Sequence, residues 1–493
     1  MKKVENCCKI DENYGGDKTV KNIDITEQIE YIGKVKKLNE GKGLRYYILT
    51  MGCQLNENDS EKICGMLEEM AYTRTDEMKE ADLVIFNTCC VRENAEEKLF
   101  GKLGEVKKIR EQNGTIIAIG GCMMQEEHIV NKIKQSYQFD VIFGTHTMHK
   151  FPQDLYKAIM SRKRVTDVID IDGEIIEGLP ISRNDNIRAS VTIMNGCNNF
   201  CSYCIVPYVR GRERSRNPKD ILDEINDLAK KGYKEITLLG QNVNSYMRVE
   251  REANVREGVK EENKAEINTF AKLLIEVNKI EGIEKIRFVS PHPKDFTDDV
   301  IDAIAKCEKV SKLIHLPLQS GSTNVLKVMN RKYTKEQFLK LVEKMREKIP
   351  NVTFSTDIIV GFPGETEEDF LDTMDVVEQV RFDQIYMFCY SIRRGTRAER
   401  MDNQIDEKIK VERLERLKAL FEKIIDEENE KKVGSIQNIL VEGISKNNPN
   451  MYTGRTLDNK VVVFEGLIKD IGKMKKIEIV KNNKWYLTGK IVE

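Results

Sequence analysis

Three cysteines lie within eight residues of one another, at Cys197, Cys201 and Cys204. They follow an apolar run over 189–194 that is typical of a β-strand, which places three thiols on one loop. Thiolates at this density bind metal. Zinc would need a fourth protein ligand, and the next histidine along the chain is His292. A 4Fe-4S cluster fits better, because three cysteines leave one iron open to a small ligand, and an open iron indicates chemistry.

Three more cysteines each follow an apolar run and precede a stretch with helical spacing: Cys53, Cys89 and Cys122. The loops after parallel strands lie together at one edge of a sheet, so these thiols are predicted to converge and again to leave an iron open. The alternative is three separate buried thiols at strand ends. The other cysteines show no ligand spacing and are predicted to be incidental or core thiols: Cys7, Cys8, Cys64, Cys90, Cys307 and Cys389.

The length of 493 residues predicts about three domains. With 40% hydrophobic and 33% charged residues, the chain belongs to neither the disordered nor the fibrous class. Its net charge of -1 provides no global attraction to nucleic acid or membrane. No apolar run reaches the roughly 18 residues of a membrane span, and the N-terminus does not read as a signal peptide. We therefore expect a cytoplasmic protein without membrane association, whose thiols stay reduced.

Residues 44–165 are predicted to form a parallel α/β domain, because short apolar runs alternate with stretches of helical spacing. The apolar runs cover 46–49, 83–86 and 116–119. Residues 1–43 are rich in Lys, Asp, Glu and Asn, so we expect a flexible or loosely docked extension there.

Residues 183–430 contain six further apolar runs separated by helical segments, which fits an incomplete (β/α) barrel better than one of eight units. The runs cover 189–194, 235–239, 285–289, 313–316, 352–360 and 384–390. The charged, apolar-poor segment 247–267 is predicted to be a surface insertion. An amphipathic helix over 405–432 is expected to close this region.

Residues 431–493 change to short apolar runs separated by Gly and Asn turns, which predicts a small antiparallel β-barrel. The runs cover 436–441, 461–464, 477–480 and 485–487. This segment holds 12 Lys and Arg against 6 Asp and Glu, so basic charge is concentrated at the C-terminus. A local excess of this kind favours contact with nucleic acid.

The loop of Cys197, Cys201 and Cys204 resembles the cluster loop of the radical S-adenosylmethionine enzymes, with the aromatic Tyr203 just before the last cysteine. The resemblance implies that S-adenosylmethionine chelates the open iron through its amino and carboxylate groups. One-electron reduction then cleaves it to a 5'-deoxyadenosyl radical that abstracts hydrogen from unactivated carbon. By the same resemblance Tyr203 lies close to the adenine, and Gln241 is expected beside S-adenosylmethionine. No catalytic residue is assigned beyond the clusters.

With both sets of cysteines in this order, the chain resembles the methylthiotransferase family from about residue 45 to the C-terminus, where the tail resembles the TRAM RNA-binding module. The resemblance is carried by 196–211, 238–246 and 357–366, and Arg397 is a departure where Pro is expected. It implies two 4Fe-4S clusters. One makes the radical and is held by Cys197, Cys201 and Cys204. The other is an auxiliary cluster that carries or supplies the sulfur and is held by Cys53, Cys89 and Cys122.

Within that family, 196–211 and 238–246 resemble the branch that acts on N(6)-(dimethylallyl)adenosine at position 37, next to the anticodon of tRNA, and gives its 2-methylthio derivative. The resemblance implies S-adenosylmethionine as methyl donor and as radical source. It also implies tRNA, an electron donor such as flavodoxin or ferredoxin, and a sulfur donor of unknown identity as partners. Two alternatives stay open: the branch acting on threonylcarbamoyl adenosine, against which 241–244 argues, and a non-catalytic tRNA-binding protein whose clusters only hold the fold.

Two further features have two readings each. Four arginines alternate after the cluster loop and are predicted either to contact phosphate or carboxylate groups or to form a solvated basic loop: Arg210, Arg212, Arg214 and Arg216. His315 lies at a predicted strand end. It is expected either to touch S-adenosylmethionine or substrate, or to be a core histidine with its hydrogen bonds satisfied.

Overall fold

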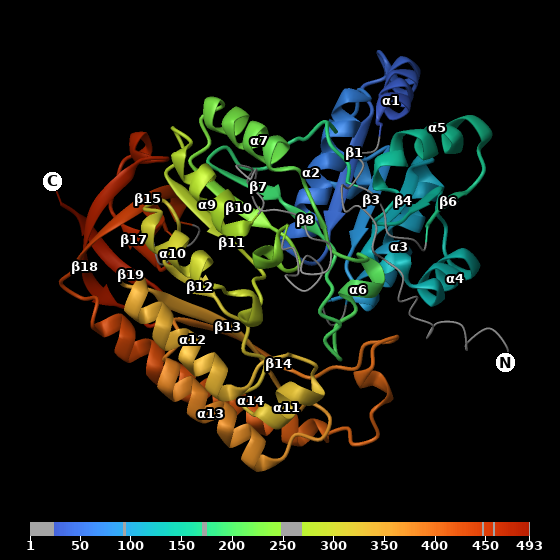
Figure 1. Cartoon of the computed structure of the whole chain (residues 1–493). Helices are drawn as coiled ribbons and strands as arrows, with labels where there is room; N and C mark the ends of the chain where they lie inside the picture. The colour runs from blue at the N-terminus through green and yellow to red at the C-terminus, as the bar shows by residue number, and fades with distance from the viewer. Residues whose placement is uncertain are drawn as a thin grey trace, which may run out of the picture.

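The computed structural model describes residues 24–91, 95–169, 175–247, 269–445, 448–456 and 459–492. Three regions lie in a row (Figure 1): an N-terminal α/β region in blue and cyan, a central barrel in green to orange, and a C-terminal β-barrel in red. The central barrel therefore contacts both of the other regions.

The N-terminal region is built on a six-stranded sheet whose paired strands are all parallel, in the order β2-β1-β3-β4-β5-β6. The strands are β1 (Arg45–Thr50), β2 (Thr73–Arg74), β3 (Leu83–Thr88), β4 (Ile116–Gly121), β5 (Val141–Phe143) and β6 (Val165–Asp167). Helices cover them: α2 (Gln54–Glu69), α3 (Ala95–Asn113), α4 (Glu127–Ser136) and α5 (Phe151–Ser161). Successive side chains of β3 enter opposite cores, Leu83 and Ile85 on one face and Val84 and Phe86 on the other. The predicted parallel α/β fold is confirmed.

Part of the segment that we expected to be loosely attached is a packed helix, α1 (Thr26–Asn39). Ile32 and Val35 are buried in the same core as residues of α2 and α5. They belong to a stripe spaced by three and four residues, the spacing that gives a helix one buried face. The stripe also includes the polar residues Gln28 and Asn39. A search for periodic apolar residues therefore does not reveal it. Residues 1–23 of that segment lie outside the described residues.

The central region contains the six predicted strands as two parallel three-stranded sheets, β11-β10-β7 and β12-β13-β14. They are β7 (Arg188–Thr192), β10 (Glu235–Leu239), β11 (Lys285–Phe288), β12 (Leu313–His315), β13 (Thr353–Val360) and β14 (Gln384–Cys389). Helices follow them: α7 (Pro218–Lys230), α9 (Phe270–Lys279), α10 (Asp298–Lys306), α11 (Thr323–Val328), α12 (Lys335–Lys348) and α13 (Glu367–Val380). The incomplete barrel is confirmed. Except for Met247, the predicted insertion 247–267 lies outside the described residues.

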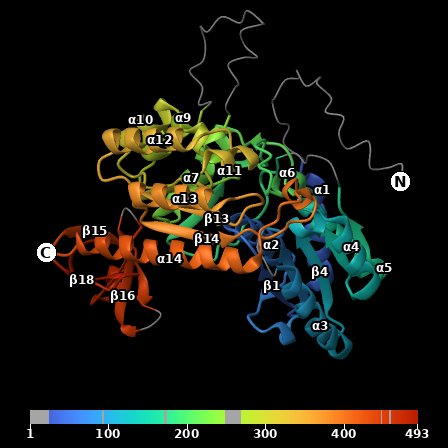
Figure 2. The same cartoon turned by 90° about the horizontal axis from the view of Figure 1, so that it is seen from below.

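Alternation along β13 and β14 gives the barrel an apolar outer layer and a polar and aromatic inner face. Phe354, Ile358 and Ile385 join the core beneath the helices. Ser355, Asp357 and Tyr386 alternate with them and therefore lie on the opposite, inner face. The predicted amphipathic helix is α14 (Glu407–Glu430), which runs along the molecule from the C-terminal β-barrel toward the N-terminal region (Figure 2).

The C-terminal region is a closed five-stranded barrel in the order β15-β16-β17-β19-β18. Its strands are β15 (Ile436–Ser445), β16 (Asn448–Thr456), β17 (Val461–Phe464), β18 (Met474–Asn482) and β19 (Leu487–Ile491). The small barrel is confirmed, but one of its pairings, β17 with β19, is parallel. Strand directions cannot alternate all the way around a closed ring with an odd number of strands. Five strands therefore require at least one parallel pair.

This small barrel docks where the central strands begin. The ammonium of Lys285, at the start of β11, donates to the Thr456 carbonyl at 3.2 Å and lies 3.8 Å from Glu235 at the start of β10. Lys460 pairs with Asp383, just before β14, at 3.2 Å. The opposite ends of the strands thus remain available to the N-terminal region.

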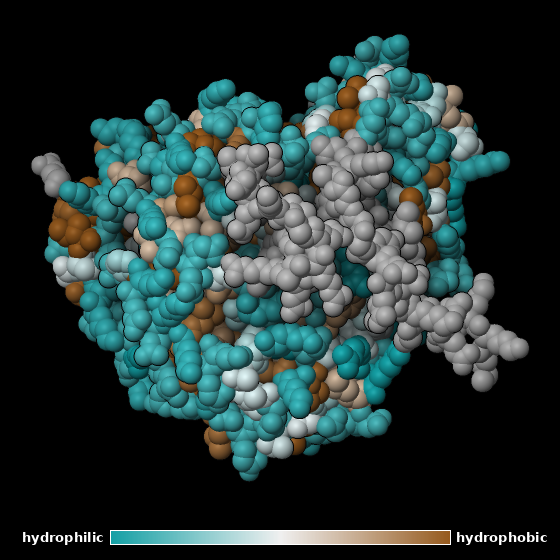
Figure 3. Space-filling model, viewed as in Figure 1, coloured by the Kyte–Doolittle hydropathy of each residue, from teal (hydrophilic) through white to brown (hydrophobic). Residues whose placement is uncertain are grey.

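The surface visible in Figure 3 is mostly hydrophilic, with apolar residues scattered among polar ones. No helix in the described part of the chain combines the length and the apolar character that crossing a membrane requires.

Candidate metal centres

The first three cysteines lie on one loop between β8 (Met194–Asn195) and α6 (Val206–Val209). Backbone hydrogen bonds shape it: the Cys204 amide donates to the Cys201 carbonyl at 2.9 Å, and the Cys197 amide donates to the Gly211 carbonyl at 3.1 Å. Gly196 has a φ of +81°, and a Cβ there would lie 1.9 Å from the Arg212 carbonyl oxygen. Only glycine permits this close turn.

The structure brings Cys197, Cys201 and Cys204 together in a buried setting. Burial, with a smaller contribution from the neighbouring thiols Cys204 and Cys201, raises the pKa of the Cys197 thiol to about 12. Burial likewise raises the pKa of Cys204 to about 12, with Cys201 adding to the effect. Sulfur atoms placed this close would repel as thiolates, so the loop needs a cation to neutralise them.

A buried arginine that we did not predict supports this loop. Arg331 donates from Nη1 to Cys201 Sγ and to the Tyr203 hydroxyl, both at 3.4 Å, and from Nη2 to the Pro317 carbonyl at 3.0 Å. The Ser202 amide donates to the Met329 carbonyl at 2.9 Å. Arg331 follows α11, far along the chain from the cysteines, and nothing in its sequence context indicates this contact.

Tyr203 and Gln241, the residues predicted to lie beside S-adenosylmethionine, both border the loop. The Tyr203 ring packs edge-on against Phe362, with 6.4 Å between ring centroids. Gln241 accepts the Gly196 amide proton on Oε1 and thereby holds the residue before Cys197. Their contact with S-adenosylmethionine stays a prediction.

The second three cysteines come from three strands whose ends are level. Thr50 of β1 pairs with Asn87 of β3, and Thr88 of β3 pairs with Gly121 of β4. Cys89 and Cys122 directly follow the second pair, and Cys53 lies shortly after β1, as the residue immediately before α2. Gly52 has a φ of +109°, and a Cβ there would lie 2.6 Å from Cys89 Sγ. The close approach of the first two loops therefore depends on glycine.

Asn56, in the first turn of α2, joins all three loops. Its Nδ2 donates to the Met51 carbonyl at 2.9 Å and to the Thr88 carbonyl at 2.7 Å. Its Oδ1 accepts from the thiols of Cys53 at 3.9 Å and Cys122 at 3.7 Å. One buried amide thus holds the three cysteine loops in a fixed relation.

Arg210 connects the two groups of cysteines. It follows α6 of the barrel loop, is only 5% exposed, and donates from Nε to Cys122 Sγ at 3.1 Å. Its Nη2 donates to Asn56 Oδ1 at 2.8 Å and pairs with Asp59 at 2.7 Å. Ile205 and Val209 of the same segment pack against Cys122. The two groups therefore lie on facing sides of one interface.

Cys90, predicted to be an incidental or core thiol, lies next to the second group of cysteines. It packs beside the cluster of Cys122, Ile205 and Val209, and hydrogen bonding with Cys122 and burial raise its pKa. The same hydrogen bond lowers the pKa of Cys122 against the opposing effect of burial, and the Arg210 charge adds to that lowering. Cys64 and Cys307 are core thiols, Cys389 packs against the barrel core, and Cys7 and Cys8 lie outside the described residues.

Each group of three thiols is compatible with a 4Fe-4S cluster that keeps one iron open. Among the described residues, no three His, Cys, Asp or Glu side chains are placed to hold one metal ion. A cubane cluster is larger than one ion and takes its thiolates around a wider perimeter. In each group a buried arginine N–H also points at one sulfur, as expected around a cluster whose ligands carry negative charge.

Of the four arginines after the barrel loop, Arg210 and Arg216 are buried, Arg214 is half-buried and Arg212 is exposed. Arg216 pairs with Glu177 at 2.5 Å and with Glu224 at 2.8 Å, so it and Arg210 meet protein carboxylates. Arg212 stacks on the Phe200 ring at 4.4 Å, and Arg214 donates to the Arg210 carbonyl at 3.1 Å. The solvated-loop reading is wrong for the two buried arginines.

His315 lies on the inner barrel face. It hydrogen-bonds to Ser355 at 3.0 Å and to Asp357 at 3.3 Å. Its hydrogen bonds are satisfied, yet its side chain keeps 20% of its surface exposed. It is therefore not a fully buried core histidine, although its hydrogen bonds are satisfied. Its contact with S-adenosylmethionine or substrate stays a prediction.

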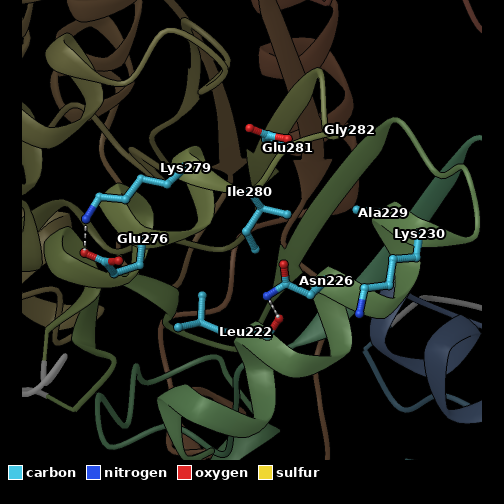
Figure 4. Close-up of a pocket in the computed structure, with 9 residues that line it drawn as sticks. All are labelled: Leu222, Asn226, Ala229, Lys230, Glu276, Lys279, Ile280, Glu281 and Gly282. Atoms are coloured by element: carbon cyan, nitrogen blue, oxygen red, sulfur yellow. Dashed lines mark hydrogen bonds and ion pairs between the residues drawn. The ribbon is translucent and has the colours of Figure 1, made fainter.

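A pocket of about 660 Å³ lies elsewhere, between α7 and α9 on the outside of the barrel (Figure 4). Two of its polar side chains already have partners. Asn226 donates to the Leu222 carbonyl at 2.8 Å, and Lys279 pairs with Glu276 at 2.6 Å. None of the cysteines lines it, so we do not assign it to the chemistry of this chain.

Comparison with known proteins first defines the class. Residues 191–377 match the Radical SAM superfamily, residues 45–144 match Uncharacterized protein family UPF0004, and residues 430–492 match the TRAM domain. A solved structure of the radical S-adenosylmethionine methyltransferase TsrM from Kitasatospora setae, with cobalamin and a [4Fe-4S] cluster bound, is 14% identical with a TM-score of 0.52. It covers 72% of this chain and 74% of its own, and it shows the fold alone.

Curated relatives define the family. A tRNA-2-methylthio-N(6)-dimethylallyladenosine synthase from Acetivibrio thermocellus is 51% identical over 95% of this chain and 96% of its own. One from Clostridium botulinum strain Alaska E43 is 50% identical over 96% of this chain and 100% of its own. This chain belongs to the family of tRNA-2-methylthio-N(6)-dimethylallyladenosine synthases. A 4Fe-4S cluster and S-adenosylmethionine follow from its radical SAM region.

Proposed function

We propose that this protein is a tRNA methylthiotransferase that converts N(6)-(dimethylallyl)adenosine next to the anticodon to its 2-methylthio derivative. The observation that carries the proposal is the placement of two groups of three cysteines on facing sides of one interface, joined by Arg210. Family membership supports the choice of substrate. Residues 44–165 would hold the auxiliary cluster, residues 183–430 would perform the radical chemistry, and residues 431–493 would add affinity for tRNA.

The roles of the cysteines divide between the two sides of the interface. Cys197, Cys201 and Cys204 would hold one cluster, and Cys53, Cys89 and Cys122 would hold an auxiliary one. When bound, the clusters and S-adenosylmethionine supply one-electron chemistry at an unreactive C–H bond together with the sulfur and the methyl group. Asn56 and Arg331 fix thiols that would hold the clusters, and the burial of Cys89, Cys122, Cys197 and Cys201 keeps water away from those sulfur atoms.

The inner barrel face offers a surface for the adenine. Tyr386 and Phe388 alternate on β14 and are 45% and 51% exposed, although aromatic side chains of this size are usually covered. His315 packs edge-on against Tyr386, with 6.1 Å between ring centroids. Bases taken out of an RNA strand stack on aromatic rings and hydrogen-bond to polar groups nearby. This face fits a planar base presented at the open ends of the strands.

Other partners follow from the chemistry. An electron donor such as flavodoxin or ferredoxin would reduce the barrel cluster, and a sulfur donor would renew the sulfur that each product carries away. The C-terminal barrel presents exposed Trp485 and Tyr486 together with basic side chains, a combination that suits RNA.

The test is mass spectrometry of nucleosides from the tRNA of a strain that lacks this protein, with and without the gene restored. We expect the 2-methylthio derivative of N(6)-(dimethylallyl)adenosine to disappear and return. Loss of a methylthio group from threonylcarbamoyl adenosine instead would assign the chain to the other substrate. An unchanged profile, with no 5'-deoxyadenosine released from S-adenosylmethionine under anaerobic reduction, would leave a non-catalytic tRNA-binding protein.

A further inference from the structure

Arg210 occupies an unusual position for a charged side chain. It lies on the barrel segment, yet its Nε and Nη2 donate to the N-terminal region, where they contact Cys122, Asn56 and Asp59. By comparison, the buried Arg216, six residues later, pairs with two carboxylates and also donates to the Thr192 carbonyl. Arg210 pairs with one carboxylate and directs its Nε at a sulfur atom. That geometry needs an explanation other than charge neutralisation.

The backbone beside Arg210 reaches the other group of cysteines. The carbonyl of Gly211, the next residue, accepts the Cys197 amide proton at 3.1 Å. Two adjacent residues therefore touch a cysteine of each group, one through its side chain and the other through its main chain. A single peptide unit therefore joins the two groups of cysteines.

We propose that Arg210 is a positioning residue of the auxiliary cluster, which holds Cys122 in place through its Nε–H and raises the reduction potential of that cluster. The proposal rests on the proposed function only in taking Cys53, Cys89 and Cys122 as ligands. A cluster gains negative charge when it accepts an electron, so a hydrogen bond and a positive charge at a ligand sulfur stabilise the reduced form. Asp59 partly cancels that charge, because it pairs with the same guanidinium at 2.7 Å.

The two residues therefore predict shifts of opposite sign. Arg210→Met removes the charge and the hydrogen bond at similar volume, and should lower the potential of the auxiliary cluster. Asp59→Asn keeps an oxygen that can accept from Arg210 but removes the opposing charge, and should raise the potential. Arg210→Lys keeps the positive charge but lacks the planar guanidinium with its several N–H donors. Its auxiliary cluster should have a reduction potential between those of Arg210→Met and the unaltered protein.

The experiment is a redox titration, followed by electron paramagnetic resonance, of full-length protein reconstituted anaerobically with iron and sulfide. Cys197, Cys201 and Cys204 are all replaced by Ala so that the auxiliary cluster alone is observed. If the protein with these three replacements does not hold iron, all six cysteines are kept. The signal of the auxiliary cluster is then identified as the one that disappears in Cys53→Ala. Arg331→Met is the matched control, because it removes a buried arginine that contacts a cysteine of the other group.

At a fixed poise we expect the ratio of reduced to oxidised auxiliary cluster to fall about tenfold in Arg210→Met, equivalent to about 59 mV for one electron. It should rise in Asp59→Asn and stay unchanged in Arg331→Met. An unshifted potential in Arg210→Met with full iron content overturns the proposal, as does an equal shift in the control. If Arg210→Met loses its iron, the test rests on Asp59→Asn. The proposal is then overturned if the reduction potential does not rise in Asp59→Asn. Iron retained after Cys53, Cys89 and Cys122 are replaced together with Cys197, Cys201 and Cys204 would instead overturn the proposed ligands.

Discussion

The two groups of cysteines are brought together by opposite routes. The barrel group is local, since one loop of eight residues supplies all three thiols, and distant residues such as Arg331 only support it. The auxiliary group is assembled from three strands, and it exists only because the ends of β1, β3 and β4 are level. The barrel group therefore depends on its own sequence, and the auxiliary group depends on the sheet.

This difference extends to electrostatics. In the barrel group, burial raises the pKa of Cys197 and Cys204 to about 12. In the auxiliary group, the hydrogen bond from Cys90 lowers the pKa of Cys122, and Arg210 adds to that lowering. The thiolate form of Cys122 is thus favoured both by Cys90 of the N-terminal region and by Arg210 of the barrel. The two regions form one site, although each carries its own cysteines.

The largest expected effect separates the groups by function. Replacing any of Cys197, Cys201 or Cys204 by Ala should abolish cleavage of S-adenosylmethionine, because two thiolates do not hold a cluster with one open iron. Release of 5'-deoxyadenosine under anaerobic reduction with dithionite measures it. Cys307→Ala, which changes a core thiol outside both groups, is the control and should keep activity. Cleavage at the unaltered rate in a barrel-group variant would contradict the assignment.

The auxiliary group should respond differently in the same assay. Ala at Cys53, Cys89 or Cys122 is expected to leave cleavage measurable and to stop formation of the methylthio product, since only the sulfur-bearing cluster is lost. Cys90→Ala is the matched control, because Cys90 contacts Cys122 without being one of the three proposed ligands. Normal product from the Cys53 variant would mean that this group is structural.

A third, smaller effect tests whether the sheet assembles the auxiliary group. Asn56→Ala should remove about half of the bound iron, because the loops of Met51 and Thr88 lose their shared donor. Asn58, two residues later on α2, is the matched control. It contacts the barrel instead, donating to the Ser190 carbonyl at 3.1 Å and accepting from Thr192 at 2.9 Å. Asn58→Ala should lower the thermal midpoint and keep the iron, and equal iron loss in both variants would refute the role of Asn56.

The barrel group should tolerate loss of its supporting residue better. Arg331→Met is expected to retain iron and to slow cleavage of S-adenosylmethionine roughly tenfold, which corresponds to about 1.4 kcal/mol in the barrier. The reason is that Arg331 orients Cys201 and Tyr203, whereas the loop backbone still presents the thiols. Iron analysis and the rate of 5'-deoxyadenosine release check this. Complete loss of iron would show that the barrel group depends on distant residues as strongly as the auxiliary group does.

Both groups of cysteines could be predicted from the sequence, but from different signals. Spacing along the chain revealed Cys197, Cys201 and Cys204, and strand ends revealed Cys53, Cys89 and Cys122, because hydrophobic patterning fixes where parallel strands stop. Arg331, Asn56 and the contacts of Arg210 could not be predicted. Their roles depend on which side chain fills a gap between distant segments, and a local pattern contains no information about that.

The fold shows the same limit. The six central strands were found because each is apolar on the face that packs against helices. Helix α1 was missed because its buried stripe includes Gln28 and Asn39, which are buried through contacts made by the tertiary structure. Strand β16 was missed because it is largely polar and is held by its neighbours in a closed ring. Closure of that ring also imposed the parallel pairing of β17 with β19.

The smallest expected effect concerns the region that carries neither group. Truncation near residue 430 would uncover the buried pair of Lys285 and Glu235, so removal of surface charge is the sharper test of whether the C-terminal barrel adds affinity for tRNA. Changing its exposed lysines Lys473, Lys476 and Lys481 to Gln should weaken tRNA binding, and each lost phosphate contact should reduce the slope of log affinity against log salt by about 1.

Cleavage of S-adenosylmethionine should not change in that variant, because both groups of cysteines lie toward the other ends of the central strands. Its matched control replaces three exposed lysines of α3, in the N-terminal region, by Gln: Lys98, Lys107 and Lys108. Phosphate contacts add affinity without reading sequence, so the lost affinity should be the same for tRNA with and without the dimethylallyl group. A salt titration of both variants decides the matter. An equal change of slope in both would assign the effect to net charge, and a loss confined to the dimethylallyl tRNA would give the C-terminal barrel a part in choosing the base.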